Sequence, residues 1–291
     1  MVEIKRLAEC TLEEAVEAWN LGFEGYFFDM KITVDQFVNR MASEGISPTL
    51  SIVAFDHKQP IGIVKSGIRT LNGKKVAWNG GTGVAPAYRS KGVGKKLIEA
   101  AINLYKNEKV DVAYLEAISE NANAIKLYEK LGYSIIDDLE YLELKGPVTG
   151  RQTTPKDYRI ENLPTPLLEH IPFYKHFNAW QTNWRSAKDS QAIVAYNSEG
   201  TEVGYANFRK SYNDQGEHVG TVLFQCEADP RLEEASRITL ELILHVFGDF
   251  SDDIRRLIPN LPVQNSSITY AVLKELGFSP TVTQVLMRRE V

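Results

Sequence analysis

The fold of this chain is decided by the stretch Val84-Ala85-Pro86-Ala87-Tyr88-Arg89-Ser90-Lys91-Gly92-Val93-Gly94-Lys95-Lys96-Leu97. It predicts the end of a strand, a basic turn with two glycines, and the start of a helix. Apolar residues at helical spacing continue the helix as far as Tyr105. Gly92 and Gly94 have no Cβ, so the backbone N–H groups of the turn can approach a ligand closely. Because those N–H groups open a helix and basic side chains surround them, the turn predicts a phosphate or pyrophosphate site.

Length and composition limit the classes of protein that fit. The chain has 291 residues, enough for two domains, and its 43% hydrophobic and 24% charged residues are ordinary for a folded soluble protein. A net charge of −5 argues against a general nucleic-acid binder. The start of the chain lacks a signal-peptide core and no apolar run is long enough for a membrane span, so we expect no membrane partner. Cys10 and Cys226 are isolated, which indicates a reducing cytoplasm and gives no metal spacing.

Local signals in the first half predict alternating helices and strands. Capping boxes at Thr11 and Thr33 begin two helices, and an aromatic stretch over 23–30 lies between them. A glycine-rich interruption, Gly80-Gly81-Thr82-Gly83, indicates a bulge or the close approach of a ligand. The expected strands are 4–7, 50–55, 61–71, 76–84, 112–118, 133–136 and 141–145, with a hairpin at Asn72-Gly73 and a helix over 121–131 that ends at Gly132.

The second half repeats this order. We expect strands over 158–163, 192–196, 202–209 and 219–228, a mostly helical run over 166–184, and an apolar helix over 232–247. The heptapeptide 272–278 matches 127–133 in spacing, which favours an internal duplication. Together with the linker composition after residue 145, this predicts a domain over 1–146, a linker over 147–157 and a second domain over 158–291.

Two motifs of the first half resemble those of the GCN5-related N-acetyltransferase (GNAT) superfamily. Residues 89–94 are similar to its acyl-CoA signature, which is Arg or Gln, two residues, Gly, one residue, then Gly or Ala. Residues 121–133 are similar to its second motif. The resemblance covers roughly residues 1–145. It implies an α/β (α+β) fold with two GNAT-like domains in tandem, each a mixed, mostly antiparallel sheet flanked by helices.

The same resemblance implies a reaction and a set of site residues. Acetyl-CoA would be the co-substrate, with its pantetheine between the diverging strands that carry Val84 and Glu116, and an amine would attack the thioester directly. Tyr128 would lie near the sulfur, where a phenol can protonate the departing thiolate. The cofactor-binding residues implied in this way are Val84, Arg89, Ser90, Lys91, Gly92, Val93, Gly94, Lys95 and Asn121, the turn acting through its backbone amides.

These residues also have plain structural interpretations. The turn could be a strand-to-helix connection without a ligand, Asn121 an N-cap and Tyr128 a core aromatic. A P-loop does not fit, because Lys95 is followed by Lys96 instead of Ser or Thr. A Rossmann turn does not fit either, because only two glycines match.

The general base and the acceptor site are less defined by the sequence. Glu116, on the strand before the helix of Tyr128, is one candidate base; Glu24 and Asp29, in the aromatic stretch, are others, and water is a further possibility. The aromatic residues Phe23, Tyr26, Phe27 and Phe28 would line an acceptor pocket or form part of a core or an interface.

The second half lacks the features of the basic turn. When Pro230 is aligned with Pro86, Glu233 takes the place of Arg89, Ser236 that of Gly92 and Ile238 that of Gly94. Leu273 takes the place of Tyr128 by the heptapeptide match. Acidic residues at a helix start repel a pyrophosphate. We therefore expect the second domain to bind no CoA, and either to wall the acceptor site or to support the fold.

The sequence as a whole predicts an acetyl-CoA-dependent N-acetyltransferase, an acyltransferase of EC 2.3.1 type, with Tyr128 as general acid. The acceptor would be a primary amine of a small molecule or a peptide, and no nucleic acid, membrane or metal is expected. A non-catalytic acyl-CoA-binding or sensor protein is the alternative, and transfer to a hydroxyl or thiol is a third possibility. The sequence does not decide the acceptor, the acyl-chain preference, or between a monomer and a homodimer.

Overall fold

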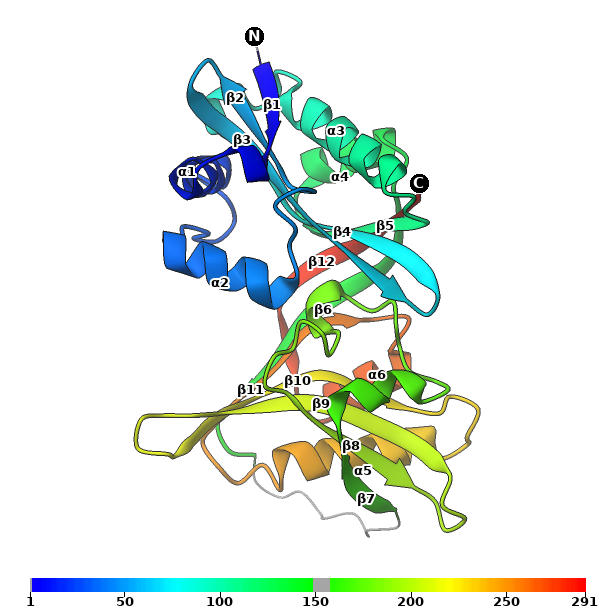
Figure 1. Ribbon diagram of the computed structural model, residues 1–291. Helices are drawn as coiled ribbons and strands as arrows, with labels where there is room; N and C mark the ends of the chain where they lie inside the picture. Colours follow the sequence, from blue (N-terminus) through cyan, green and yellow to red (C-terminus); the bar gives the residue numbers. More distant parts are fainter. Residues whose placement is uncertain (1, 149–157) are drawn as a thin grey trace. The chain divides into compact units, whose positions relative to one another are not determined.

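The computed structural model describes residues 2–148 and 158–291, which form two compact units (Figure 1). The first unit comprises Met1–Ile136 together with Leu286–Val291, and the second comprises Asp137–Val285. The division therefore falls after residue 136, where the sequence predicts a boundary at 146, and the C-terminal segment belongs to the first unit. The predicted linker over 147–157 lies outside the described residues except for Pro147 and Val148.

The elements of the first unit follow the predicted order. Strands β1 to β4 pair antiparallel with their neighbours in chain order, and β4 pairs with β5 in parallel. No described helix of either unit is long and apolar enough to cross a membrane. The elements are β1 (Val2–Arg6), η1 (Leu7–Glu9), α1 (Leu12–Gly22), α2 (Val34–Glu44), β2 (Ile52–Asp56), β3 (Gln59–Leu71), β4 (Lys74–Val84), η2 (Pro86–Tyr88), α3 (Val93–Asn107), β5 (Val112–Ile118) and α4 (Ala122–Lys130).

Short-range signals explain where several of these elements begin and end. The Thr11 hydroxyl accepts a hydrogen bond from the Glu14 N–H at 3.1 Å, and the Glu14 carboxylate accepts one from the Thr11 N–H at 2.8 Å. This reciprocal cap fixes the start of α1. Asn72 and Gly73 both have positive φ, 46° and 75°, as a two-residue hairpin of matching twist requires. The predicted caps and hairpin are thus confirmed.

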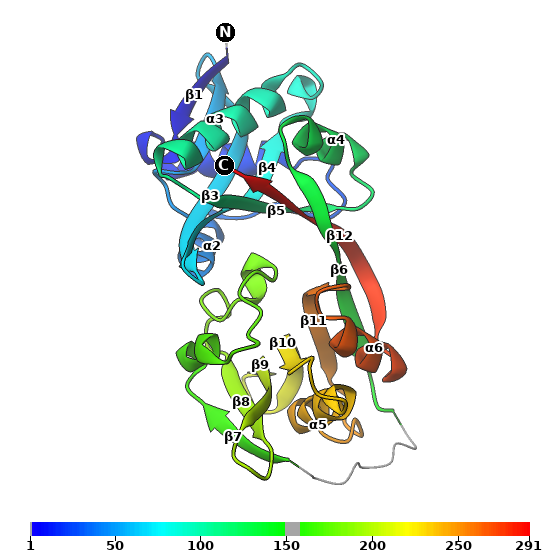
Figure 2. The ribbon, with the colours of Figure 1, turned by 90° about the vertical axis from the view of Figure 1, so that its right-hand side faces the viewer.

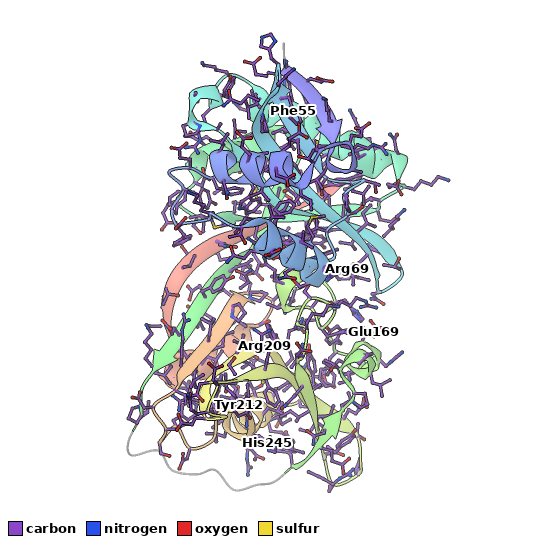
Figure 3. All side chains as sticks on the ribbon, turned by 60° about the vertical axis from the view of Figure 1, so that its left-hand side comes forward. Phe55, Arg69, Glu169, Arg209, Tyr212 and His245 are labelled. Carbon is purple, nitrogen blue, oxygen red and sulfur yellow. The ribbon has the colours of Figure 1, made fainter. Side chains whose placement is uncertain are left out.

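Helices cover both faces of the first sheet (Figure 1). On one face, Trp19 of α1 and Phe37 of α2 pack with Phe55 of β2, which is labelled in Figure 3. On the other face lies α3, whose Tyr105 hydroxyl is 2.7 Å from the Ser66 hydroxyl of β3. The apolar stripe of α3 is buried as its spacing predicts. The predicted class, a mixed and mostly antiparallel sheet flanked by helices, is confirmed.

Two long strands, β6 (Ser134–Lys145) and β12 (Ser279–Glu290), contribute residues to both units. In the first unit the end of β12 lies beside β5, and the Ser134 hydroxyl of β6 donates to the Arg288 carbonyl at 3.4 Å (Figure 2). In the second unit β6 pairs antiparallel with β11. The sequence predicts separate strands over 133–136 and 141–145, which is wrong. The strand continues through Asp137, whose carboxylate accepts hydrogen bonds from the N–H groups of Gln264 and Asn265 instead of forming a turn between two strands.

The second unit has the same strand order as the first, which agrees with the predicted duplication. Its strands run β7-β8-β9-β10-β11, followed by β6 and then β12. Strand β10 pairs with β11 in parallel, as β4 does with β5. The elements are β7 (Arg159–Leu163), η3 (Thr165–His170), η4 (Trp180–Thr182), β8 (Gln191–Tyr196), β9 (Glu202–Tyr212), β10 (His218–Ala228), α5 (Ala235–Phe247), β11 (Arg255–Pro262) and α6 (Ser267–Glu275).

The helical run predicted over 166–184 is wrong. Only the short 3-10 turns η3 and η4 form there. Pro172 lacks the N–H that a helix interior needs. The Asn183 side chain competes with helical hydrogen bonding, because its oxygen accepts a hydrogen bond from the nearby Arg185 N–H at 3.1 Å.

The C-terminal strand should be a structural part of the first unit. Met287 is completely buried, so Met287→Ala should lower the stability of this unit by about 2–5 kcal/mol. Hydrogen exchange should then be faster in β5, which lies beside β12, but unchanged in β9 of the second unit. Val291→Ala, at the half-buried end of the chain, is the control. Unchanged exchange in β5 would contradict this assignment.

Candidate active site

Strands β4 and β5 separate in the middle of the first unit. Their parallel pairing runs from Val76 opposite Val112 to Asn79 opposite Leu115. Strand β4 continues to Val84 and β5 to Ile118, but the two are no longer partners there. Backbone groups on the facing edges are therefore available to another molecule.

A β-bulge accompanies the separation. Val64 of β3 lies opposite Thr82, but Ser66 lies opposite Asn79, so two glycines of β4 stand against one residue of β3. The Asn79 side chain fixes this bulge: its oxygen accepts from the Gly81 N–H at 3.1 Å, and its amide is 2.9 Å from the Thr82 hydroxyl. The predicted bulge is confirmed.

The glycines of β4 are needed for close packing against α1. A Cβ on Gly83 would lie 2.9 Å from the Phe23 ring, and one on Gly22 would lie 2.9 Å from the Gly83 carbonyl carbon. Backbone and ring atoms at that distance cannot be displaced cheaply. The end of α1 therefore packs directly against the separated part of β4 and fixes its position.

The basic turn leads from β4 into an uncapped helix. Gly92 is the N-cap of α3 with φ of 83°, and no side chain caps the helix. A Cβ on Gly92 would have no heavy atom within 4 Å, so the backbone there is open to the surroundings. Ser90 also has positive φ, 61°. The first N–H groups of α3 thus have the arrangement that suits an anion.

The guanidinium of Arg89 is directed away from this helix start. Its Nε donates to the Val84 carbonyl at 2.9 Å, and NH2 donates to the carbonyls of Gly22 and Glu24 at 3.3 and 2.5 Å. Arg89 therefore ties the end of β4 to the end of α1 and to the aromatic stretch after it. Among the basic residues of the turn, Lys95 lies 3.7 Å from the carboxylate of Glu99.

Tyr128 lies on α4 beside the separated part of β4. Its side chain is 7% exposed, and burial raises the pKa of the phenol to about 12, although a hydrogen bond with the Thr82 side chain acts in the opposite direction. A phenol with that pKa keeps its proton at neutral pH and can act as an acid.

Asn121 connects Tyr128's helix to the aromatic stretch. Its side-chain oxygen accepts from the Ala124 N–H at 3.2 Å, which is the predicted N-cap. The same side chain hydrogen-bonds Tyr26, and this bond lowers the pKa of Tyr26 against the dominant effect of burial, which raises it. The structural interpretation of Asn121 is thus confirmed, and a contact with a cofactor stays a prediction.

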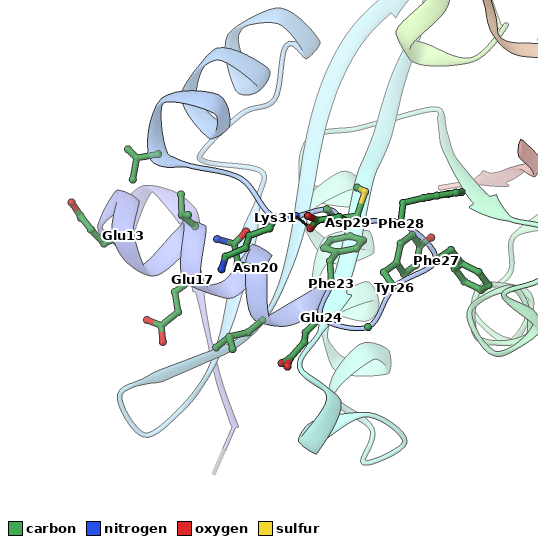
Figure 4. A pocket seen from close by; sticks show the side chains of 15 residues that line it. Glu13, Glu17, Asn20, Phe23, Glu24, Tyr26, Phe27, Phe28, Asp29 and Lys31 are labelled. Carbon is green, nitrogen blue, oxygen red and sulfur yellow. Dashed lines mark hydrogen bonds between the residues drawn. The ribbon is translucent and has the colours of Figure 1, made fainter. Parts of the chain in front are cut away.

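The three candidate bases have different surroundings. Glu116 is half-buried and its Oε2 accepts from the Trp78 indole N–H at 2.6 Å. Glu24 is exposed, and its carboxylate points away from Tyr26 (Figure 4). Asp29 is exposed and its oxygen accepts from the Lys31 N–H at 3.0 Å. Of the three, only Glu116 lies on one of the two separating strands.

A cavity of about 840 Å³ lies between α1 and the aromatic stretch (Figure 4). Phe27 and Phe28 are 48% and 46% exposed, whereas Phe23 belongs to the core with Trp19, so only part of the aromatic stretch is a core element. The lining combines aromatic rings with four carboxylates and one lysine: Phe23, Tyr26, Phe27 and Phe28, then Glu13, Glu17, Glu24 and Asp29, and Lys31. Such a lining suits a cationic ligand with an apolar part.

Sequence reasoning missed several residues of this region. Thr82 and Trp78 carry the contacts to Tyr128 and Glu116, yet the strand and the bulge predicted for this stretch give no sign of these contacts. Lys65 of β3 is completely buried, with its ammonium 4.0 Å from the ring centroid of Trp19, and burial lowers its pKa to about 7. A lysine inside the apolar run of β3 was the available signal.

The second unit departs from these features at the corresponding places. The N-cap residue of its helix α5 is Glu234, so Glu234 corresponds to Gly92 when the two helix starts are compared. The alignment of Pro230 with Pro86 instead makes Ser236 the counterpart of Gly92. Leu273 on α6 is completely buried. An acidic N-cap and a leucine thus stand where the first unit has an open glycine and a phenol.

Comparison with known proteins agrees with this geometry. The model of the acetyltransferase (GNAT) family matches residues 7–133. N-alpha-acetyltransferase 30 of Saccharomyces cerevisiae is 33% identical over 92 residues, which are 30% of this chain and 52% of that protein. The chain thus spans about half the length of this curated relative.

Two solved structures resemble the chain over its full length. A GCN5-related N-acetyltransferase from Sphaerobacter thermophilus has a TM-score of 0.65 at 12% identity, with 100% of this chain and 95% of that chain covered. A tandem GNAT protein from the clavulanic acid biosynthesis pathway has a TM-score of 0.61 at 14% identity, with 100% and 98% covered. The GNAT family model thus matches most of the first unit, and the chain as a whole has the fold of a tandem GNAT protein.

The contacts of Arg89 lead to a test that separates two roles for its side chain. Arg89→Lys keeps the charge but removes most of the carbonyl contacts, which should cost about 1–3 kcal/mol of local stability. Hydrogen exchange over 22–31 should become faster, while the affinity for CoA measured by calorimetry should change less than about threefold. A loss of CoA affinity of about tenfold or more would instead mean that the guanidinium binds the pyrophosphate.

Proposed function

We propose that the first unit transfers the acetyl group of acetyl-CoA to a primary amine. The observation that carries this proposal is the separation of β4 from β5 beyond Asn79 and Leu115, with the buried phenol of Tyr128 beside it. Members of the GNAT family use acetyl-CoA, and the residues of this chain suit that co-substrate.

The residues that would hold acetyl-CoA come from three elements. The free edge of β4 up to Val84 would bind the pantetheine amides, and the uncapped start of α3 would bind the pyrophosphate. The side chain of Asn121 would add a polar contact at the start of α4. The pyrophosphate would be held by the backbone of Arg89, Ser90, Lys91, Gly92, Val93, Gly94 and Lys95.

The proposed chemistry needs two proton transfers. The amine loses a proton, its nitrogen forms a bond to the thioester carbonyl carbon, and the C–S bond breaks. Tyr128, which its raised pKa keeps protonated at neutral pH, gives its proton to the departing thiolate. Glu116 or a water molecule would take the proton from the amine, and Trp78 would orient the Glu116 carboxylate. Orientation of both reactants beside the separated strands would supply much of the remaining advantage.

The acceptor that fits best is an amine attached to an apolar group. The carboxylates of the 840 Å³ cavity favour a cation, and its exposed aromatic rings favour an apolar part. Tyr26 belongs to this cavity and hydrogen-bonds Asn121, so the cavity adjoins the helix of Tyr128. The name of the yeast relative supports a peptide α-amine as one such acceptor.

The second unit is proposed to take no part in this chemistry. Its acidic helix start at Glu234 would repel a pyrophosphate, and Leu273 has no proton to give. The division into a catalytic and a degenerate domain is therefore part of the proposal. So is a cytoplasmic location, which rests on the two free cysteines, Cys10 and Cys226.

Tyr128→Phe should lower the turnover number by about 10²–10⁴-fold at saturating amine, because the thiolate then leaves without a proton. Release of free thiol from acetyl-CoA across an amine panel measures it. Tyr105→Phe is the matched control, since Tyr105 is also a buried tyrosine of this unit but bonds Ser66 on the face of α3. Equal turnover in Tyr128→Phe and wild type would remove this residue from the mechanism. Acetyl-CoA binding without turnover would support the non-catalytic alternative.

Gly92→Leu should abolish acetyl-CoA binding, because its side chain would enter the space proposed for the pyrophosphate. Gly73→Leu is a matched control: both glycines have positive φ, 83° and 75°, and a Cβ on either meets no heavy atom within 4 Å. Backbone strain is therefore similar in the two variants, but only one lies at the helix start. Retained affinity in Gly92→Leu, measured by calorimetry, would count against this site for the pyrophosphate.

A further inference from the structure

One buried face of the second sheet carries several polar side chains, next to an apolar cluster that includes Leu168, Val194 and Tyr205. Ala206 and Cys226 belong to the apolar core with α5. By alternation along the strands, their neighbours point to the opposite face. On that face Asn207 lies opposite Gln225, and Tyr205 lies opposite Glu227. These four side chains are 1%, 2%, 0% and 5% exposed, respectively.

Part of this layer is fixed by hydrogen bonds. The Tyr205 hydroxyl donates to the Gln225 side-chain oxygen at 3.0 Å and accepts from the Lys175 N–H at 3.1 Å. The Gln225 amide donates to the Thr182 carbonyl at 3.3 Å. These hydrogen bonds join Tyr205 and Gln225 to the segment that covers them, which includes Lys175 and Thr182.

Other atoms of the layer have no hydrogen-bond partner among the described residues. They include one carboxylate oxygen of Glu227, both amide atoms of Asn207, and the side-chain oxygen of Asn260 on β11. Burial raises the pKa of Glu227 to about 7, while a hydrogen bond with the Ser266 side chain and the charge of Lys175 act in the opposite direction. Burying polar groups without partners costs free energy, and the cost is largest for a carboxylate. A bound molecule that supplies these partners would account for the unpartnered atoms.

The covering segment differs from its counterpart in the first unit. In the first unit Phe23, which follows α1, packs against Gly83. The second unit has an irregular segment with only η3 and η4 at the corresponding place. The alignment of Pro230 with Pro86 makes Glu227 the counterpart of Gly83. Long irregular segments inside compact units are often binding elements. This one is held by an ion pair of 2.7 Å between Arg185 and Glu169. Glu169 is labelled in Figure 3.

We propose that this polar layer of the second unit binds a small protonated amine, with the Glu227 carboxylate as its counter-ion and Asn207 and Asn260 as further partners. An ammonium group only donates hydrogen bonds, and the unpartnered oxygens of Glu227, Asn207 and Asn260 can accept them. The site shares no residue with the 840 Å³ cavity or with the helix start of the first unit. It is a second amine site, independent of the proposed acetyl transfer.

The test is calorimetry of the full chain with ethanolamine, glucosamine, L-lysine and spermidine, without CoA. At least one of these amines should bind, and Glu227→Gln should weaken that binding by about tenfold or more, or 1.4 kcal/mol. Glu241→Gln is the matched control, because Glu241 is a buried carboxylate of the same unit that has a partner, Arg237 at 3.8 Å. Its affinity for the amine should equal that of wild type, as should the acetyl-CoA affinity of Glu227→Gln.

Two results would overturn the proposal: no binding by any of the four amines, or equal affinity in Glu227→Gln and wild type. The second result would place the bound amine elsewhere, and the 840 Å³ cavity is then the site to examine with Tyr26→Ala. Asn207→Ser provides an independent variant if Glu227→Gln does not fold. Failure of acetyl transfer would be seen separately, as absence of thiol release, and does not affect this test.

Discussion

The structure of the first unit depends on one constraint: β4 stops pairing with β5 after Asn79. The bulge that the Asn79 side chain fixes turns the next residues of β4 away from the ladder, and the close approach of Gly22 to Gly83 holds them there. An unpaired strand edge, an uncapped helix start at Gly92 and a protonated phenol at Tyr128 then lie along one path. None of these features alone defines an acetyltransferase, but the separated strands bring them together.

The same framework has different contents in the two units. Both have a parallel pair that follows an antiparallel meander, and both complete their sheets with a strand from the other half of the sequence. In the first unit glycines leave room along β4, and its helix start is free of acidic groups. In the second unit Glu234 occupies the N-cap position of α5 and Glu227 is buried where the first unit has glycine. We propose that the duplicated fold supports an anion site in one unit and a cation site in the other.

Much of this arrangement could be predicted from the sequence, for reasons visible in particular residues. Short-range features could be predicted because they depend only on neighbouring residues: the capping boxes at Thr11 and Thr33, the Asn72-Gly73 hairpin and the glycine bulge. The exchange of β6 and β12 between the units could not be predicted, because the partner of a strand is a long-range property. The direction of the Arg89 side chain could not be predicted either, because two of the three carbonyls that accept its hydrogen bonds, those of Gly22 and Glu24, are distant from the turn in sequence. The helix predicted over 166–184 failed because prolines and asparagines outweighed its apolar spacing.

The central claim is that one molecule of acetyl-CoA binds to the first unit, along β4 and the start of α3, with its sulfur at Tyr128. A crystal structure of the chain with CoA tests this most directly. The account predicts the pyrophosphate at the N–H groups around Gly92 to Gly94 and the thiol within hydrogen-bond reach of the Tyr128 hydroxyl. CoA bound to the second unit, or bound to the first with its thiol remote from Tyr128, would contradict it.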